Sequence, residues 1–178
     1  MGESRSNERA WIRGAQNGSA DDFERLFRHH WPAAYRAAYL VVHDTAAAED
    51  IAQESFLAAV RNLDRFDRRR PFGPWLHRIV VNRAIDFARA RGLRREVGDE
   101  PLEAVAAATR PDNPHAQSLA GAIAELPVEQ RAVIVLRHLL EYTPGEIAEL
   151  LDLPRGTVNS RLRRGLDALK DALGDDVR

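Results

Sequence analysis

Apolar residues recur every three or four positions in one segment after another, and the alternating pattern of a half-buried strand is almost absent. A short first helix is expected at about 8–16. A longer helix follows, with Ser19 or Asp21 as its N-cap and with Pro32 inside it, where a kink is expected. Its apolar stripe comprises Phe23, Leu26, Phe27, Ala34, Tyr35, Ala38 and Val42. These patterns predict an all-α fold.

A third helix is expected to begin with Thr45 as its N-cap. Its apolar stripe comprises Ala48, Ile51, Ala52, Ser55, Ala59 and Leu63, so its acidic residues should point largely outward. Segment 66–74 interrupts the pattern with three consecutive arginines, two prolines, a glycine and two phenylalanines, a composition typical of an ordered loop. Helical periodicity resumes over 75–91. The inward residues there are Leu76, Ile79, Val80, Ala84 and Phe87.

The periodicity fades between 96 and 117, where glycine and proline stand among acidic residues. This composition predicts a flexible acidic linker, with one weak turn at 102–107. We therefore expect two small helical domains, at 1–95 and 118–178, joined by the linker 96–117.

A helix-turn-helix is predicted within the second domain. Thr143 can be the N-cap of its first helix, Pro144 the first helical residue, and Glu146 the residue that reaches back in a capping box. The helix should break at 152–154. The next helix carries Val158, Leu162, Leu166 and Leu169 on its apolar side. Two short helices joined by a tight turn are what this motif requires.

The other side of that second helix is rich in hydrogen-bond donors. It comprises Arg155, Thr157, Asn159, Ser160, Arg161, Arg163 and Arg164, opposed only by Asp167. A helix fits the major groove of DNA, where arginine reads guanine and asparagine reads adenine, while other arginines hold phosphates. The alternative is an amphipathic helix with a solvated basic face.

Composition excludes several classes of function. The 178 residues are 44% hydrophobic and 30% charged, which supports a packed core. No cysteine is present, so disulfides, thiol nucleophiles and cysteine metal sites are excluded, and the histidines show no ligand-like spacing. No cofactor or metal is expected. No apolar run could span a bilayer and the N-terminal segment is charged, so we expect a cytoplasmic protein.

Charge is unevenly distributed, although the formal net charge is only −1. Segment 75–95 has Asp86 as its only acid, against six arginines, whereas 44–54 holds four acids and no base. Such segregation indicates that different surfaces meet different partners.

Four sequence blocks, in a fixed order, carry a resemblance to a known family. They are 48–56 (AEDIAQESF); 74–79 (PWLHRI) with Asn82; 126–127 (LP) with 146–148 (EIA); and 154–162 (PRGTVNSRL). The chain resembles an extracytoplasmic-function (ECF) sigma factor of the sigma-70 family over about 22–173. Each block alone would be a weak motif, but the order of all four makes chance agreement improbable.

The resemblance implies a role for the first domain in binding polymerase and melted DNA. Core RNA polymerase is the implied partner, through the clamp helices of its largest subunit and its beta flap. The implied clamp-binding residues are Glu49, Asp50, Gln53 and Glu54. The implied single-strand contacts to the minus-ten promoter element are Arg69, Arg70, Pro71, Phe72, Gly73 and Asn82. Phe72 could stack on a base or anchor the loop, and the acidic block alone could equally be a solvated helix face.

In the second domain the resemblance implies contacts to the minus-thirty-five duplex. They are Arg137, Arg155, Gly156, Thr157, Asn159, Ser160, Arg161, Arg163 and Arg164. Two positions depart from the common family pattern. Asn159 stands where a basic residue is frequent, which leaves the promoter sequence open. Asp152 stands where the turn usually has glycine, which costs little because aspartate tolerates left-handed conformations. Members are often held inactive by an anti-sigma factor, which no residue here identifies.

The leading hypothesis is thus a transcription initiation factor with no catalytic chemistry of its own. One rival is a duplex-binding regulator, which would form dimers on palindromic sites without polymerase. That rival explains the helix-turn-helix but leaves the acidic block and the basic loop without a role. The other rival is an enzyme, but His29, His30, His77 and His138 have no nucleophile or paired carboxylate in a recognisable motif.

Overall fold

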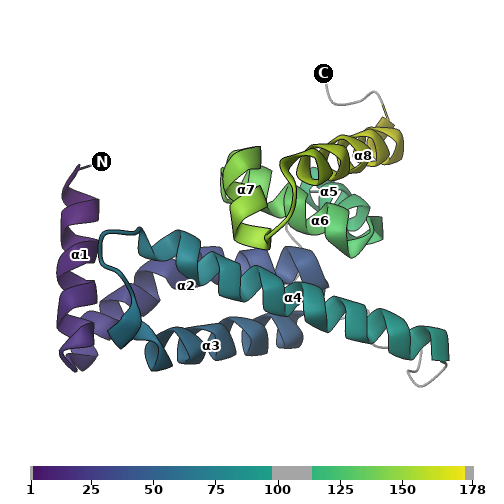
Figure 1. Ribbon diagram of the computed structural model, residues 1–178. Helices are drawn as coiled ribbons and strands as arrows, with labels where there is room; N and C mark the ends of the chain where they lie inside the picture. Colours follow the sequence, from purple (N-terminus) through teal and green to yellow (C-terminus); the bar gives the residue numbers. More distant parts are fainter. Residues whose placement is uncertain (1, 98–113, 175–178) are drawn as a thin grey trace.

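A computed structural model describes residues 2–97 and 114–174, with side chains over 7–94 and 119–174. All described regular elements are helices, as predicted (Figure 1). In chain order they are α1 (Gly2–Gln16), α2 (Ala20–Val42), α3 (Thr45–Arg61), the 3-10 helix η1 (Leu63–Arg65), α4 (Phe72–Val97), α5 (Pro114–Glu125), α6 (Val128–Ile134), the π-helix η2 (Val135–Leu139), α7 (Pro144–Leu151) and α8 (Arg155–Leu173).

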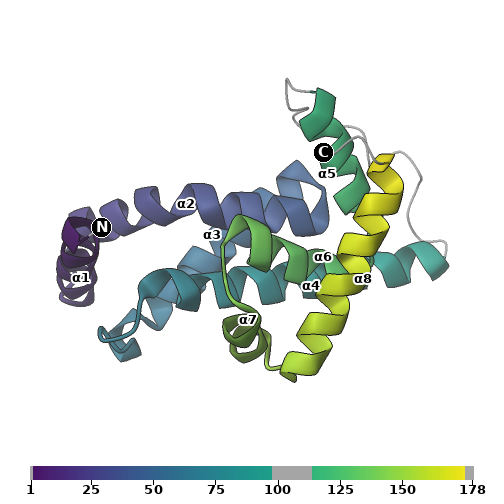
Figure 2. The ribbon, with the colours of Figure 1, turned by 90° about the horizontal axis from the view of Figure 1, so that it is seen from above.

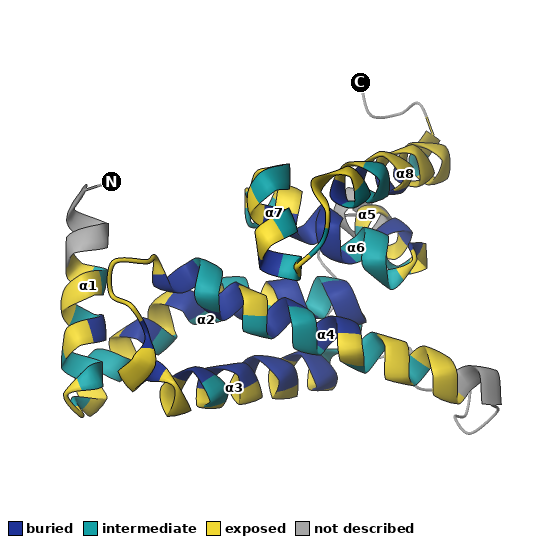
Figure 3. Cartoon of the chain, viewed as in Figure 1, coloured by how far each residue is buried: buried dark blue, intermediate teal, exposed yellow. Residues whose placement is uncertain are grey.

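The first helical group consists of α1 to α4. Helices α2, α3 and α4 lie side by side, and α1 crosses one end of α2 (Figure 1). The buried sides of these helices face one another in the interior (Figure 3). The predicted apolar stripes lie there, and Leu26, Leu76 and Val80 are fully buried. Burial of these side chains supplies the main stabilisation of the group, at about 1.5–3 kcal/mol for a fully buried leucine or valine.

Helix starts in this group follow local capping chemistry. Of the two caps considered for α2, Ser19 or Asp21, the structure has Ser19, whose side chain accepts a hydrogen bond from the Asp22 N–H. The predicted cap Thr45 is wrong by one residue. Asp44 is the N-cap of α3, in extended conformation, and its carboxylate accepts from the Ala47 N–H. Helix α2 continues past Pro32 as one element.

The interruption between α3 and α4 is shorter than predicted. Helix α4 already begins at Phe72 rather than at 75, and it runs to Val97 rather than to 91. Proline disfavours a helix interior because it lacks an N–H donor, but in the first turn that donor has no partner anyway. Pro74 therefore fits the first turn of α4, and the loop contracts to the residues before Phe72.

The second helical group consists of α5 to α8 and contains the predicted helix-turn-helix in α7 and α8. The capping box of Thr143 and Glu146 is confirmed, with both reciprocal hydrogen bonds present. Asp152 ends α7 in the left-handed conformation, at φ 54°. Leu166, predicted on the apolar stripe of α8, is 45% exposed. The packed face passes instead through Gly165, where an added Cβ would lie 3.1 Å from Ile134 Cγ1.

The two groups touch each other through α2 and α4 on one side and α5, α6 and α7 on the other (Figure 2). The His77 Nδ1 and the Tyr142 hydroxyl are hydrogen-bonded at 2.7 Å, and Arg89 pairs with Glu129 at 3.0 Å. The Arg131 guanidinium donates to the Val41 carbonyl. The predicted linker lies, over 98–113, outside the described residues, as does the turn predicted at 102–107, while its two ends belong to α4 and α5.

Candidate nucleic-acid and protein interfaces

A short loop with three arginines projects from the end of the first helical group. We call residues 67–71 the basic arch; all five are exposed (Figure 3). Inside it, the Asp67 carboxylate accepts from the Arg69 N–H at 3.0 Å, and the Asp67 carbonyl accepts from the Arg70 N–H at 2.9 Å. The arch therefore presents Arg68, Arg69 and Arg70 to solvent on a turn that aspartate stabilises.

Two buried phenylalanines flank the basic arch. Phe66 and Phe72 pack edge to face, with ring centroids 5.7 Å apart, and the Trp75 ring lies 4.7 Å from that of Phe66. Of the two roles left open for Phe72, its burial matches an anchor rather than a stacking surface. Gly73 is also buried, whereas Asn82 is half-buried on α4, about 15 Å along the helix axis from Phe72.

The acidic block lies on the outer face of α3. Glu49, Asp50, Gln53 and Glu54 are all exposed, as predicted. Gln53 donates to the Glu49 carboxylate at 3.3 Å, and Arg83 of α4 pairs with Glu54 at 2.6 Å. Among the described residues no ion pair neutralises Glu49 or Asp50, so both carboxylates keep their charge on this face.

The sequence reasoning missed an apolar extension of this acidic face. Leu57 is 55% exposed and Val60 is 42% exposed, on the same helix. Leu57 stands four residues after Gln53, so helical spacing could have revealed it. Large apolar side chains beside polar groups are typical of the core of a protein–protein interface.

The predicted duplex-binding residues differ in how far they are exposed. Arg155, Gly156, Asn159, Arg163 and Arg164 are exposed, together with Arg137 on η2.

The remaining predicted residues of α8 are half-buried. The Ser160 hydroxyl donates to the Thr157 carbonyl at 2.9 Å. Arg161 lies near Glu129 of α6. Burial would raise the Glu129 pKa, but a backbone N–H and Arg89 hold it below its usual value, and the charge of Arg161 adds a smaller effect. Thr157, Ser160 and Arg161 are thus set apart from the fully exposed basic face of the helix.

The N-terminus of α8 is open to an anion. Its N-cap is Pro154, and no side chain there accepts from the first-turn amides. The Thr157 and Val158 N–H groups donate to the Pro154 carbonyl, while the Arg155 and Gly156 backbone lies in exposed residues. Amides at a helix N-terminus, together with the helix dipole, attract phosphate.

A hollow separates the basic arch from the helix-turn-helix. It measures about 390 Å³, and its lining includes Arg70 and Arg78 on one side and Glu146 and Glu149 of α7 on the other. Hydrogen bonds from Thr143 hold the pKa of Glu146 below its usual value, so this group stays ionised at neutral pH. In this arrangement carboxylates of the second group therefore face cations of the first.

Comparison with known proteins identifies two family regions in the chain. The model of Sigma-70 region 2 matches residues 26–94, and the model of Sigma-70, region 4, matches residues 116–169. Within the described residues of these regions lie the acidic face, the basic arch and α8 up to residue 169.

Curated relatives match along most of the chain. The ECF RNA polymerase sigma factor SigW of Bacillus subtilis is 33% identical, over 92% of this chain and 95% of its own length. The ECF RNA polymerase sigma factor SigM of Mycobacterium tuberculosis is 34% identical, over 85% of this chain and 77% of its own length.

Two solved structures share the fold. CnrH, in complex with the cytosolic domain of CnrY, superposes with a TM-score of 0.69 at 28% identity, over 94% of this chain and 97% of CnrH. The sigma factor RpoE from Bartonella quintana, in complex with the anti-sigma factor NepR, gives a TM-score of 0.72 at 25% identity, over 88% of this chain and 99% of RpoE. Since the matches span both helical groups, the chain belongs to the ECF RNA polymerase sigma factors of the sigma-70 family.

Proposed function

We propose that this sigma factor binds core RNA polymerase through the acidic face of α3 and holds promoter DNA at two places, the basic arch and α8. As a sigma factor it directs transcription initiation. The observation that carries the assignment of surfaces is the exposure of three chemically different faces on one helical chain: an acidic one, a basic loop and a donor-rich helix.

The acidic face is the proposed contact to the clamp helices of the largest polymerase subunit. Glu49, Asp50, Gln53 and Glu54 would meet basic polymerase side chains, with Leu57 adding apolar area. Charge complementarity of this kind accelerates association and excludes wrong partners. The second helical group is assigned to the beta flap by family resemblance alone.

The basic arch, with Asn82, is the proposed site of the melted minus-ten strand. A single strand requires cations along its backbone and polar groups for the edge of an extruded base. Arg69 and Arg70 supply exposed cations, and buried Phe72 and Gly73 fix the point at which the arch joins α4. Pro71 restricts the backbone between them.

Helix α8 is the proposed reader of the minus-thirty-five duplex. Exposure favours Asn159, Arg163 and Arg164 for base edges. The open N-terminus of α8 at Arg155 and Gly156 favours phosphate binding there. Arg137 adds a further exposed positive charge for phosphate. Thr157, Ser160 and Arg161 remain proposed contacts at the margin of this face.

We further propose a domain division at 1–95, 96–117 and 118–178, which the two family matches support by ending at 94 and starting at 116. The family consists of sigma factors, which are not enzymes, and we propose that this chain likewise leaves catalysis to the polymerase. We propose the cytoplasm as its location.

Both solved neighbours are in complex with another protein, which for RpoE is named as an anti-sigma factor. This supports the proposal that an anti-sigma protein also restrains this chain.

Among the described helices, none is long and apolar enough to cross a membrane.

In vitro transcription with purified core polymerase on a randomised promoter library tests the proposal. A defined start site should appear only when this protein is added. Equal transcripts without it, or dimeric binding to palindromes without polymerase, would favour the duplex-binding regulator instead.

A further inference from the structure

Helix α1 is linked to both flanks of the basic arch, directly to the turn before it and through His30 to the residues after it. It lies outside residues 26–94, which the Sigma-70 region 2 model matches, and it carries none of the surfaces proposed above. In the fold it crosses the end of the first helical group, next to the loop between α3 and α4 (Figure 1). Gln16 contacts the residues before the arch directly, and Glu8 reaches the residues after it through His30.

Gln16, the last residue of α1, is hydrogen-bonded to the turn that precedes the basic arch. Its side-chain Nε2 donates to the backbone carbonyl of Leu63 at 2.8 Å and to that of Phe66 at 3.0 Å. Both carbonyls belong to the turn that leads into the arch. One amide group thus ties two points of this turn to a helix about fifty residues earlier in the chain.

Glu8 acts on the residues after the arch through a histidine. The His30 Nε2 donates to the Glu8 carboxylate at 2.8 Å, and both side chains are largely buried, at 10% and 16% exposure. The His30 ring packs on Phe72 with ring centroids 5.1 Å apart, and its Cε1 lies 3.4 Å from where a Cβ on Gly73 would stand. Glu8 therefore orients the ring that fills the space beside the start of α4.

Between these two points the arch is fully exposed, and apart from the hydrogen bonds to Asp67 its backbone is held at its two ends. A loop that is ordered before it binds loses less conformational entropy on binding. We infer that α1 is a brace that fixes the basic arch for the melted promoter strand, with Gln16 and Glu8 as positioning residues. This inference rests on the function proposed for the arch.

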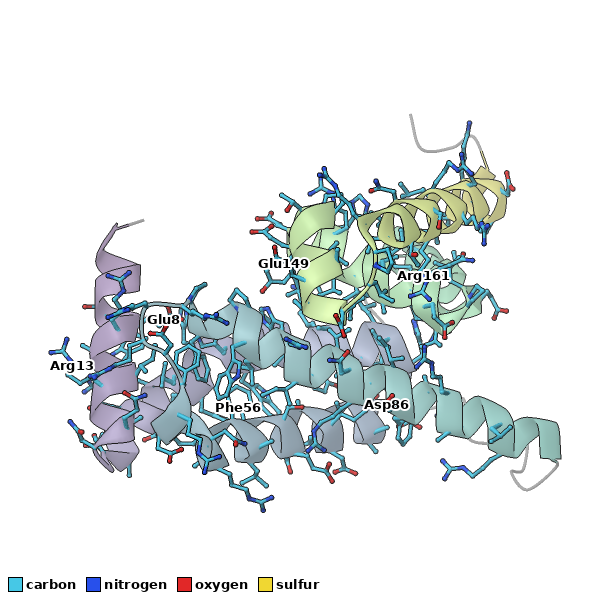
Figure 4. The ribbon with its side chains drawn as sticks, viewed as in Figure 1. Glu8, Arg13, Phe56, Asp86, Glu149 and Arg161 are labelled. Carbon is cyan, nitrogen blue, oxygen red and sulfur yellow. The ribbon has the colours of Figure 1, made fainter. Side chains whose placement is uncertain are left out.

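Four variants separate the brace from general stability. Gln16→Glu replaces the donating amide by a carboxylate that faces two carbonyl oxygens. Glu8→Ala removes the acceptor of His30, whereas Glu8→Gln keeps an oxygen acceptor at the same place. Arg13→Gln is the matched control, since Arg13 is exposed on α1 and points away from the arch (Figure 4).

The first measurement is amide hydrogen exchange in the free protein. Exchange over 66–73 should accelerate about tenfold in Gln16→Glu and in Glu8→Ala, since one or two hydrogen bonds are lost. It should stay at the wild-type rate in Glu8→Gln and Arg13→Gln. Unchanged exchange in the first two variants would overturn the brace. So would an equal acceleration in α3, because it would show only a loss of overall stability.

The second measurement is promoter opening by the complete holoenzyme, on a promoter selected from the randomised library and followed by permanganate reactivity of unpaired thymines. Opening should slow about fivefold in Gln16→Glu and Glu8→Ala at unchanged affinity for core, and return to normal in Glu8→Gln. Wild-type opening in variants with accelerated exchange would refute the link to DNA. Failure of the wild-type holoenzyme to open any promoter would refute the proposed function, while the exchange result would still decide the brace.

Discussion

Arg164 extends from the exposed side of α8, about two and a half helical turns from its N-terminus. Arg164→Ala should reduce the preference for the correct base by about 1–3 kcal/mol at one or two positions of the minus-thirty-five element. The reason is that an arginine pairs with the edge of a guanine, and this contact is specific to that base. Holoenzyme binding to a set of single-base promoter variants measures this. Lys170→Ala, exposed on the last turn of the same helix, should give wild-type preferences. A uniform loss across all promoters would assign Arg164 to phosphate.

His77 gives the stability of the fold a dependence on pH. Burial, and secondarily the nearby His30, lower its pKa from 6.5 to about 4, so the folded protein keeps this ring neutral. The unfolded chain takes up the proton below about pH 6.5, which favours unfolding. The contribution of His77 to the free energy of unfolding should therefore be constant above pH 6.5, fall by at most about 3 kcal/mol as the pH drops to 4, and change no further below that.

Denaturant titrations at pH 7, 6 and 5 measure this slope. In His77→Gln the free energy of unfolding should change less with pH, since glutamine does not titrate. The remaining slope should come partly from His43, whose pKa burial and Arg131 also lower to about 4. An unchanged slope in His77→Gln would show that His77 is not the group that resists protonation.

The structure also shows which residue roles the sequence could predict. Thr143 was predictable as a cap, and Ser19 as one of two candidates, because the signal and its partner lie within three residues. Asp44 and Thr45 are both good capping residues, so propensity alone could not choose between them. The position of Arg161 near Glu129, and that of Gln16 under the arch, depend on residues 32 or more positions away, which no local pattern encodes.

Helix α7 begins with a capping box whose worth can be measured. Thr143→Ala removes the oxygen that accepts from the Glu146 N–H and the hydroxyl that donates to its carboxylate. The free energy of unfolding should fall by about 1 kcal/mol, the usual cost of losing such a cap. Denaturant unfolding measures it, and Thr143→Ser should keep nearly all of the stability. A loss as large in Thr143→Ser would mean that the methyl group, and not the hydroxyl, stabilises this end of α7.

Helix α3 allows a test of core binding without loss of the fold. Glu49→Lys with Asp50→Lys reverses two exposed charges, so stability should change little, while association with core polymerase should be lost because the reversed charges meet like charges. Leu57→Ser should weaken association by removing apolar area. Affinity can be measured with labelled core. Glu24→Lys, exposed on α2, is the control, and equal affinity in the double variant would remove the assignment of this face.

At the scale of the elements, the pattern of apolar positions was sufficient to predict α2, α3, α7 and α8, because each has one buried stripe. It was insufficient at Phe72, where a helix starts within a segment rich in glycine and proline. There the tertiary packing of Phe72 against Phe66 and His30 outweighs the local propensity. Tertiary packing also explains why Leu166 is exposed. Gly165 permits a closer approach of α8 to α6, so the packed face of α8 passes through Gly165.

The whole molecule is too small, in the conformation described, for the two DNA contacts proposed. A chain of this length folds to a radius of gyration of about 16 Å. The two promoter elements are named for positions about 25 base pairs apart, which is about 85 Å of duplex. Both contacts can therefore form together only after the two helical groups separate and the hydrogen bond between His77 and Tyr142 breaks. The carboxylates of α7 that face the basic arch would leave at the same time.

Locking the two groups together should thus abolish promoter-directed transcription. The ion pair of Arg89 and Glu129 joins them at 3.0 Å, and the chain has no cysteine, so Arg89→Cys with Glu129→Cys gives a unique pair of thiols. A short cleavable thiol crosslinker on this variant should prevent transcription from the selected promoter, and a reductant should restore it. Each single-cysteine variant, treated in the same way, should transcribe normally. Full transcription by the crosslinked protein would mean that both promoter contacts form without separation of the two groups, and the proposed division of the DNA between the arch and α8 would have to be abandoned.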